Sequence, residues 1–253
     1  MDAWKRPTYW EQLPTCSLSD DLSAGLADVN LVVVCTPVGL IVDQVHQLAK
    51  SARPGTLFTD SGSTKRTIAE ALDGPLPNHC RFLGSHPLAG SNKTGVEHAR
   101  ADLFEHRLVA ITPTENSREE DVKRLKAFWS SLGAKVVCLS PEEHDRVTAA
   151  TSHMPHAVAA ALVASLPEPW ADLTGSGFAD MSRLAAGDAT MWRQIFIDNR
   201  EYVRDSIREF IGQLQRLAGL IEDANTTALE SYLTEAKKKR EALDIDVDGE
   251  RSF

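Results

Sequence analysis

The sequence places a histidine where it could act as an acid or a base. His86 follows the apolar run Arg81–Leu83 and precedes Pro87, which disfavours both a continued strand and an immediate helix. Gly90–Ser91 then supply flexible backbone with free N–H groups. We therefore expect His86 at the tip of a strand, beside an open loop, where open α/β sheets bind ligands. The alternative is a turn histidine without chemistry.

A second polar turn, Asp60–Lys65, follows a short apolar run and precedes a helical pattern. Its backbone N–H groups can face an anion or a polar group. The spacing of a Walker loop, GxxxxGK[ST], is missing. Ser63 is the candidate functional residue of this turn, and the alternative is that Ser63 only caps the helix.

The carboxyl-terminal half contributes two histidines and an arginine. His153 and His156 are three residues apart, so they share one helical face. A helical metal pair is usually four residues apart with a glutamate between, so we expect buried, hydrogen-bonded histidines and no metal. Arg183 lies among apolar residues, and a buried arginine needs an anionic partner from the protein or a ligand.

The elements that must position these residues alternate between strand and helix as far as Leu139. Apolar runs predict strands, and the segments between them have helical spacing, which together indicate a doubly wound sheet. The predicted strands are Leu31–Cys35, Thr56–Asp60, the strand that leads to His86, Leu108–Ile111 and Lys135–Leu139. The predicted helices are Gly39–Lys50, Arg66–Leu72 and Ser117–Leu132.

From Ser140 onward the pattern is helical only. Ser140–Glu143 forms a capping signature with proline at the first helical position, and Pro155 should kink the long helix that follows. Apolar residues from Met191 to Ile221 recur at helical spacing. Such a helix would be about 45 Å long, so we expect a partner surface on it, and a final helix over Asn225–Leu243.

The composition sets limits on function. The chain has 253 residues, of which 42% are hydrophobic and 25% charged, as in a globular protein. The net charge of −9 argues against nucleic-acid binding. No apolar run approaches the ~18 residues of a membrane span. The four cysteines lack CxxC spacing, so we expect reduced, mostly buried thiols in a cytoplasmic protein.

Four segments together resemble the prephenate (or arogenate) dehydrogenase family of tyrosine biosynthesis. Asp60–Lys65 resembles its D-x-G-S-x-K turn, and Gly84–Ser91 its G-S-H-P-M-A-G-S loop. Ser152–His156 resembles its S-H-L-P-H helix, and Gly175–Trp192 its G-G-F-x-D-x-T-R-I-A-x-S-D-P-x-M-W segment. The four motifs occur in the family's order from Leu31 to about Leu243 and are highly specific together.

The resemblance implies a fold and a reaction. The fold is an N-terminally truncated Rossmann-like parallel sheet (1–139), followed by an all-helical substrate and dimerisation domain (140–253) that forms a homodimer through the Met191–Ile221 helix. The reaction is hydride transfer from the ring C4 alcohol to NAD or NADP, with loss of the ring carboxylate as CO2.

The resemblance also assigns roles to single residues. His86 would be the base that takes the hydroxyl proton, a role that suits a histidine at neutral pH. Ser63 would hydrogen-bond to His86 or to the hydroxyl. The other implied contacts are Arg183 with a substrate carboxylate, His153 and His156 with the substrate, and Thr36, Pro37 and Ser63 with the nicotinamide ribose.

The sequence departs from the family in several places. Ser61 replaces an apolar residue, Asn92 a glutamate, Gly187 a serine and Ala189 a proline, and none of these changes removes a polar group that the chemistry needs. The family's GxGxxG turn is missing from the 253 residues. We therefore expect weak cofactor binding by this chain and an exposed strand edge along Leu31–Cys35.

Three other interpretations stay open. One is another β-hydroxyacid-type dehydrogenase, whose base would be a lysine of the helical domain. The second is a non-catalytic regulatory or dimerisation remnant that lost the dinucleotide site. The third is a helical interaction scaffold, favoured only by the long carboxyl-terminal helices.

Overall fold

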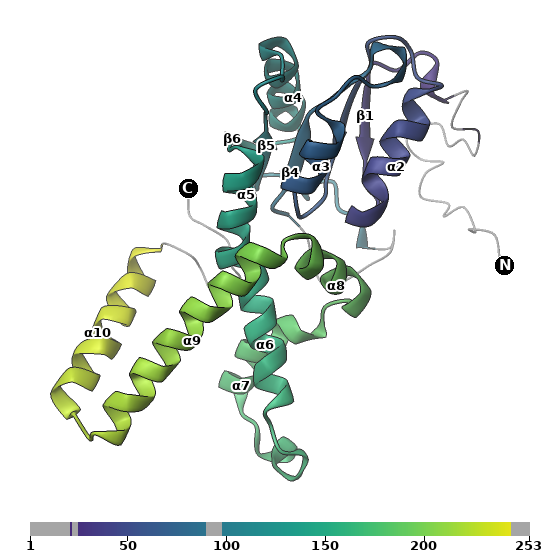
Figure 1. Ribbon diagram of the computed structural model, residues 1–253. Helices are drawn as coiled ribbons and strands as arrows, with labels where there is room; N and C mark the ends of the chain where they lie inside the picture. The colour runs from purple at the N-terminus through teal and green to yellow at the C-terminus, as the bar shows by residue number, and fades with distance from the viewer. Residues whose placement is uncertain (1–20, 22–24, 90–97, 244–253) are drawn as a thin grey trace.

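The computed structural model describes residue 21 and residues 25–89 and 98–243. Figure 1 shows a sheet region above a helical region, joined by a helical segment that descends from one to the other. The expectations for Gly90, Ser91, Asn92, Cys16 and the acidic tail fall outside the described residues.

The strands form two three-stranded sheets. In the first, β1 (Leu31–Val34), β2 (Leu57–Asp60) and β3 (Arg81–Phe82) are parallel, with β2 in the centre. In the second, β4 (Gly84–Pro87) runs antiparallel to β5 (Leu108–Thr112), which pairs in parallel with β6 (Lys135–Cys138). The predicted strands are present, but the third one divides between the two sheets, so one pair of the expected parallel sheet is antiparallel.

His86 is the third of the four residues of β4, opposite Ala110 of β5, so it lies one residue before the end of its strand, close to the predicted strand tip. Pro87 is the last residue of β4, where its missing N–H removes little from the ladder. The next N–H, of Leu88, donates to the Leu108 carbonyl at 2.8 Å. The strand therefore continues past the histidine and holds it rigidly.

The change of partner occurs at Gly84. An added Cβ at this position would lie 2.5 Å from Thr112 Oγ1 and 3.3 Å from Lys65 Cδ. The absence of a side chain thus permits the close approach of β4 to β5 at this point.

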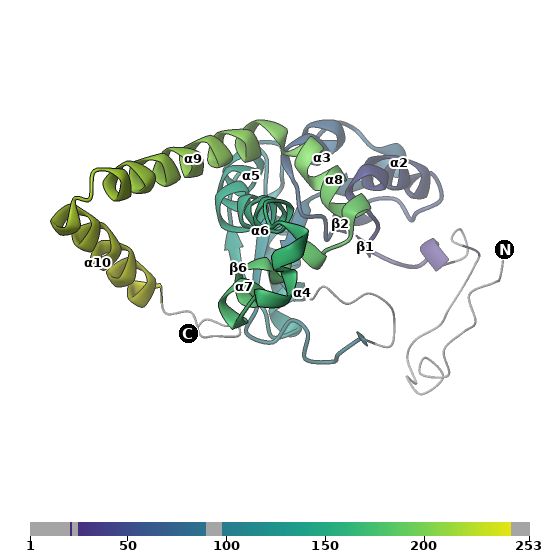
Figure 2. The same ribbon diagram turned by 90° about the horizontal axis from the view of Figure 1, so that it is seen from below.

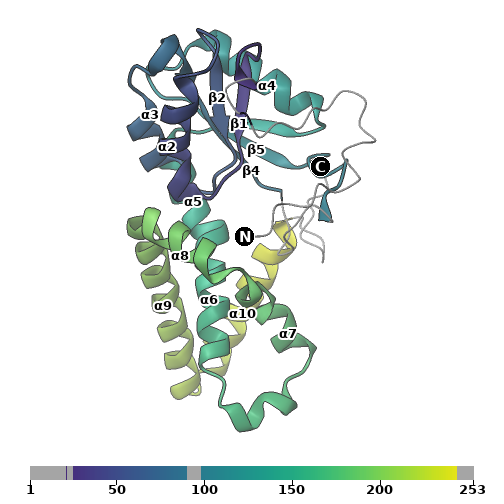
Figure 3. The same cartoon turned by 90° about the vertical axis from the view of Figure 1, so that its right-hand side faces the viewer.

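Helices cover both faces of the sheet region. α2 (Val38–Ala49) and α3 (Arg66–Leu72) lie on one face, and α4 (Glu119–Ser131) lies on the other (Figure 3). The first face buries a core that includes Ile41, Val45, Phe58, Ile68 and Leu72. The second buries Leu57, Leu83, Val109, Ile111, Leu125 and Trp129. This arrangement confirms the predicted Rossmann-like α/β region.

The described residues after Ser140 form helices only. They are α5 (Pro141–Thr148), η4 (Ala149–His153), α6 (Met154–Ala164), η5 (Glu168–Leu173), α7 (Ser176–Ser182), η6 (Arg183–Ala186), α8 (Ala189–Asp198), α9 (Arg200–Glu222) and α10 (Thr226–Ala242). Ser140 caps α5 as expected, because its side chain accepts the N–H of Glu143. Before Pro155 the helix widens into the π-helical turn η4, which accommodates the proline without ending the helix.

The predicted single helix over Met191–Ile221 is wrong. The segment breaks at Asn199, whose backbone (φ −101°, ψ 27°) separates α8 from α9. Figure 2 shows α9 and α10 as a pair that projects away from the rest of the molecule. At 1.5 Å per residue, the 23 residues of α9 still span about 35 Å.

Two further findings bear on the expected environment. Cys80 is buried, but Cys35 and Cys138 are exposed at strand ends, so the expectation of mostly buried thiols is wrong for these two. Among the described residues, no helix combines the length and apolar character needed to cross a membrane.

Candidate active site

Ser85, the residue that precedes His86 in β4, holds the predicted base in place. The Ser85 hydroxyl lies 2.6 Å from the Asp60 carbonyl oxygen and 2.9 Å from Thr59 Oγ1, and the Ser85 N–H donates to Asp60 Oδ1 at 3.1 Å. The Trp129 indole N–H also donates to Ser85 Oγ at 3.2 Å. These buried contacts fix β4 against β2 and so fix the position of His86.

A buried ion pair supports the turn beside His86. Lys65 Nζ bonds Asp60 Oδ2, and both side chains are almost fully buried. Asp60 Oδ2 also accepts the Gly62 N–H at 2.9 Å. The paired charges and the extra donor satisfy a carboxylate that would otherwise be costly to bury, and they hold the Asp60–Lys65 turn in one conformation.

His86 is 8% exposed and bonds a second histidine that comes from the helical region. Its Nδ1 lies 2.9 Å from His144 Nε2. His144 Nδ1 lies 2.8 Å from Asp145 Oδ1. Burial, then the charges of His144, Lys65 and His153, lowers the pKa of His86 well below its usual 6.5, so the imidazole is neutral and can accept a proton at neutral pH.

Asp145 also occupies the turn that was expected to face an anion. Its Oδ1 accepts the Lys65 N–H at 2.8 Å and its Oδ2 accepts the Arg66 N–H at 2.9 Å. Lys65 is the N-cap residue of α3 and makes no side-chain cap bond, so Ser63 is not the cap. The expected polar group at this helix start is therefore a carboxylate of the protein itself.

Ser63 lies in the same turn and is half-buried. Among the described hydrogen bonds, none joins its hydroxyl to His86, whose Nδ1 is directed to His144 instead. The hydroxyl of Ser63 is thus left to the second expected role, a contact with the substrate.

His153 is 1% exposed and lies at the end of the π-helical turn. Its Nδ1 accepts from Asn199 Nδ2 at 3.1 Å, and the same amide donates to the Asp145 carbonyl at 2.8 Å. Within the described part of the chain, no group meets full hydrogen-bond geometry at His153 Nε2, although the Ser63 backbone lies near enough to the ring to raise its pKa. Burial, partly offset by Asp145, lowers the pKa of His153 to about 4.

His156 stacks on Trp192 with ring centroids 3.5 Å apart. Together they line an apolar pocket whose other walls include Leu184, Ala185, Gly187 and Phe196. Arg183 is exposed, so the expectation of a buried arginine is wrong. Its charge nonetheless lowers the pKa of His156, after the larger effect of burial, which places the guanidinium near this pocket.

Thr36 and Pro37 follow β1 at the same edge of the sheet as the Asp60–Lys65 turn. Thr36 Oγ1 donates to Gln44 Oε1 at 2.7 Å, and Pro37 is the N-cap of α2 without a side-chain cap bond. Thr36, Pro37 and Ser63 therefore follow the carboxyl ends of β1 and β2, whereas His153 and His156 belong to the helical region.

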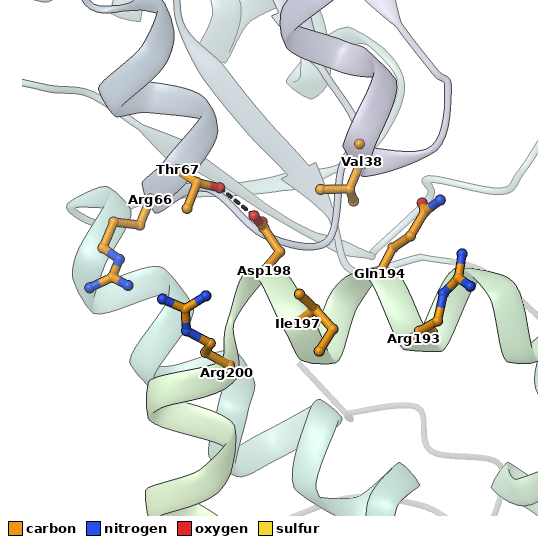
Figure 4. Close-up of a pocket in the computed structure, with 9 residues that line it drawn as sticks. Val38, Arg66, Thr67, Arg193, Gln194, Ile197, Asp198 and Arg200 are labelled. Carbon is orange, nitrogen blue, oxygen red and sulfur yellow. Dashed lines mark hydrogen bonds between the residues drawn. The ribbon is translucent and has the colours of Figure 1, made fainter.

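A separate pocket between the two regions contains none of the predicted site residues (Figure 4). It lies between α2, α3 and α8, where Asp198 Oδ1 accepts from Thr67 Oγ1 at 2.6 Å and Asp198 Oδ2 accepts from Thr64 Oγ1. Arg66 also bonds Glu201 at 3.0 Å. These bonds hold the helical region against the turn that carries Ser63.

Sequence reasoning missed His144, Asp145 and Asn199. Only the structure shows that the buried positions of α5 are His144, Asp145 and Thr148. A helix that presents polar side chains where apolar ones are expected to pack is burying a hydrogen-bond network.

The described residues thus form a Rossmann-like α/β region whose His86 bonds His144 of the helical region that follows it. Residues 14–138 match the family model of the prephenate dehydrogenase nucleotide-binding domain, and residues 140–235 match that of the prephenate dehydrogenase dimerization domain. The chain therefore belongs to the prephenate dehydrogenase family.

Individual relatives agree with this assignment. Prephenate dehydrogenase from Bacillus subtilis (strain 168) is 33% identical over 234 residues, which are 90% of this chain and 63% of the relative. The chain thus spans less than two thirds of the length of that relative.

Two solved structures are similar in fold. Prephenate dehydrogenase from Aquifex aeolicus, in complex with hydroxyphenyl propionate and NAD+, has a TM-score of 0.79 at 36% identity, covering 85% of this chain and 77% of the other. Arogenate dehydrogenase from Synechocystis has a TM-score of 0.76 at 27% identity, covering 89% and 82%.

Proposed function

We propose that the protein catalyses the oxidative decarboxylation of prephenate or arogenate, with hydride transfer to NAD or NADP, in tyrosine biosynthesis. The observation that carries this proposal is the buried, neutral His86, hydrogen-bonded to His144 at the ligand-binding edge of the sheet. Membership of the prephenate dehydrogenase family supports the substrate class, and relatives named for each substrate keep both in consideration.

His86 is the proton acceptor in this proposal. The hydroxyl at ring C4 gives its proton to the imidazole as the hydride leaves the same carbon. Loss of the ring carboxylate as CO2 then completes an aromatic ring, which supplies the driving force. A base that is neutral before the reaction and fixed within hydrogen-bond reach can contribute about 10²- to 10⁴-fold to the rate.

The substrate contacts come from the helical side and the turn. Arg183 is an exposed guanidinium that can bind a carboxylate through two parallel hydrogen bonds. The unpaired Nε2 of His153 supplies a buried polar contact, and His156 with Trp192 supplies an aromatic wall for the ring. Ser63 bonds the hydroxyl from the opposite side.

The residues at the sheet edge fit the nicotinamide end of a dinucleotide. Thr36 and Pro37 open α2 with no side-chain cap bond, and Pro37 and Gly39 are exposed at this end of the helix. These residues and Ser63 would hold the ribose, and the bound cofactor would accept the hydride. No GxGxxG turn occurs in the 253 residues, so the described contacts concern this end only.

The same proposal includes a domain boundary after Leu139, a cytoplasmic location and a homodimer. The dimer is supported by the match to a dimerization-domain family model and by the apolar side chains that α9 and α10 expose. These are Ile211, Leu214, Ile221, Leu233 and Leu243.

The direct test offers prephenate and arogenate, each with NAD and NADP, and follows reduced nicotinamide and the aromatic product. We expect turnover with at least one combination of substrate and cofactor. The His86→Ala substitution should lower kcat by about 10²- to 10⁴-fold with little change in KM. Because the pKa of His86 is depressed, wild-type kcat should stay level as the pH falls from 8 to below 6.5.

The matched control is His46→Ala, which removes an exposed histidine of α2 and should leave kcat unchanged. Full kcat in His86→Ala would exclude this base. Binding of substrate without turnover of any pair would favour the non-catalytic regulatory or dimerisation role.

A further inference from the structure

Hydrogen bonds join three histidines of the site to Asp145, two of them through its carboxylate and one through its backbone carbonyl. Asp145 is 1% exposed, as are His144 and His153. One path runs from Asp145 Oδ1 to His144 and on to His86. The other runs from the Asp145 carbonyl through Asn199 to His153.

With a neutral His144, the first path has one consistent arrangement of protons. Both oxygens of the Asp145 carboxylate accept backbone N–H groups, those of Lys65 and Arg66, so the carboxylate acts as an acceptor. His144 Nδ1 must then carry the proton, which leaves His144 Nε2 as an acceptor in the neutral ring. His86 Nδ1 must therefore donate, and His86 Nε2 keeps its lone pair.

The second path has the opposite outcome. The Asn199 amide has two N–H donors, one for the Asp145 carbonyl and one for His153 Nδ1. His153 Nδ1 is therefore an acceptor, and His153 Nε2, the buried nitrogen without a partner, carries the proton.

We propose that Asp145 and His144 are positioning residues that fix the tautomer of the base, so that His86 presents a lone pair at Nε2. The same aspartate, through Asn199, fixes His153 as a donor at Nε2. The carboxylate of Asp145 thus sets the acceptor at His86, and its backbone carbonyl, through Asn199, sets the donor at His153. The catalytic meaning of this arrangement rests on the proposed function, whereas the tautomers themselves do not.

The arrangement also accounts for the proton during the reaction. His86 Nε2 takes the hydroxyl proton, and Nδ1–H stays bonded to His144 Nε2, which stabilises the imidazolium. No proton needs to leave His86 at this step. A base in the wrong tautomer has no lone pair to offer, and in a serine-protease triad such an error costs about 10⁴-fold in kcat.

The tautomers can be read directly by nitrogen-15 NMR of the whole chain labelled at its histidine rings. We expect a protonated Nδ1 and an unprotonated Nε2 in His86 and His144, and the reverse in His153. This measurement needs neither cofactor nor turnover. The opposite tautomer at His86 in the wild type would overturn the proposal without any variant.

Two variants test the role of His144. His144→Asn can still donate to Asp145 but places no atom at the position of Nε2, and His144→Phe keeps the ring shape without any polar atom. In both variants His86 Nδ1 loses its acceptor, so we expect a shift of His86 toward protonated Nε2. The control is His46→Asn, which removes an exposed histidine of α2 and should leave the His86 signals unchanged.

Kinetic measurements test the catalytic role of His144 independently of the NMR experiment. If the wild type turns over prephenate or arogenate, kcat of His144→Asn should fall about 10²-fold with little change in KM. An unchanged His86 tautomer in both folded variants would refute the positioning role, whatever the activity. The expected tautomer shifts in a protein inactive on both substrates would uphold the hydrogen-bond assignment and refute the proposed function.

Discussion

At the scale of single residues, the site separates groups that are already paired from groups that are free for a ligand. Asp145, His144 and Asn199 are buried and bonded to other protein groups. His153 Nε2 is buried without a described partner, and Arg183 is exposed. Because an unpaired buried donor is costly, the free groups are the ones a bound substrate can stabilise.

Arg183 should contribute mainly to binding. Arg183→Ala removes a charge-assisted contact with a substrate carboxylate, so affinity should weaken by about 1.5–3 kcal/mol, seen as a higher KM or Kd for prephenate. Arg183→Lys should restore only part of the affinity, because an ammonium cannot make the planar two-bond contact. Arg118→Ala, an exposed arginine before α4, is the control, and an equal loss there would contradict the assignment.

His153 should make the fold sensitive to acid. Its pKa is about 4 in the folded chain, because of burial, and about 6.5 when unfolded. Between these two pH values the unfolded chain binds the proton and the folded chain does not. The resulting loss of folding stability is absent above pH 6.5 and grows as the pH falls toward 4. From pH 7 to pH 5 the loss for this residue is about 2 kcal/mol.

The measurement is the urea unfolding free energy at the two pH values and one protein concentration. His153→Gln keeps an acceptor for Asn199 but does not titrate, so it should lose about 2 kcal/mol less than the wild type over this range. The exposed His46→Gln should behave like the wild type. An identical pH dependence in His153→Gln would show that the ring is not buried as a neutral group.

At the scale of elements, the sequence predicts most bounds correctly where burial is uniform. α3 spans Arg66–Leu72 as predicted, and α2 and β2 differ by a residue or so at their ends, since apolar spacing is a local property. The strand that carries His86 was misread because its change of partner at Gly84 depends on β5, which lies far along the chain. The break at Asn199 was missed for a similar reason, because its amide bonds Asp145 and His153 of other helices.

The candidate site shows the same limit. His86, Ser63, His153 and His156 could be singled out because they lie in recognisable motifs. His144 and Asp145 form their bonds across the two regions, and no local spacing predicts that His144 reaches β4. Their contribution therefore needed the three-dimensional structure.

Gly84 tests the close approach of β4 and β5. Gly84→Ala would place a methyl group 2.5 Å from Thr112 Oγ1, and such overpacking should lower the free energy of unfolding by about 1–3 kcal/mol. Gly74→Ala is the matched control, because no atom lies within 4 Å of the added Cβ. Denaturant unfolding should show Gly74→Ala unchanged or slightly stabilised, and equal stabilities of the two variants would contradict the tight packing.

At the scale of the whole molecule, the sheet region buries a hydrophobic core on each face, whereas the helical region leaves apolar side chains exposed. α9 packs on α5, η4 and α6, but its far end and α10 contact each other near their connecting turn and project outward (Figure 2). They expose Ile211, Leu214, Ile221 and Leu233, each by 45–60%, and clustered exposed apolar side chains mark protein–protein contacts. A second copy of the chain is the partner that the proposed homodimer supplies.

The homodimer can be tested by placing a charge on this surface. Leu214 of α9 is 50% exposed, so Leu214→Asp costs little in a monomer but would bury a carboxylate in a dimer. Sedimentation at micromolar concentration should show a wild-type dimer and a mostly monomeric variant. Leu40→Asp is the control, because Leu40 is 49% exposed in the first turn of α2, where an acidic residue is tolerated; it should remain dimeric. A monomeric wild type would refute the dimer, and a dimeric Leu214→Asp would move the interface away from α9.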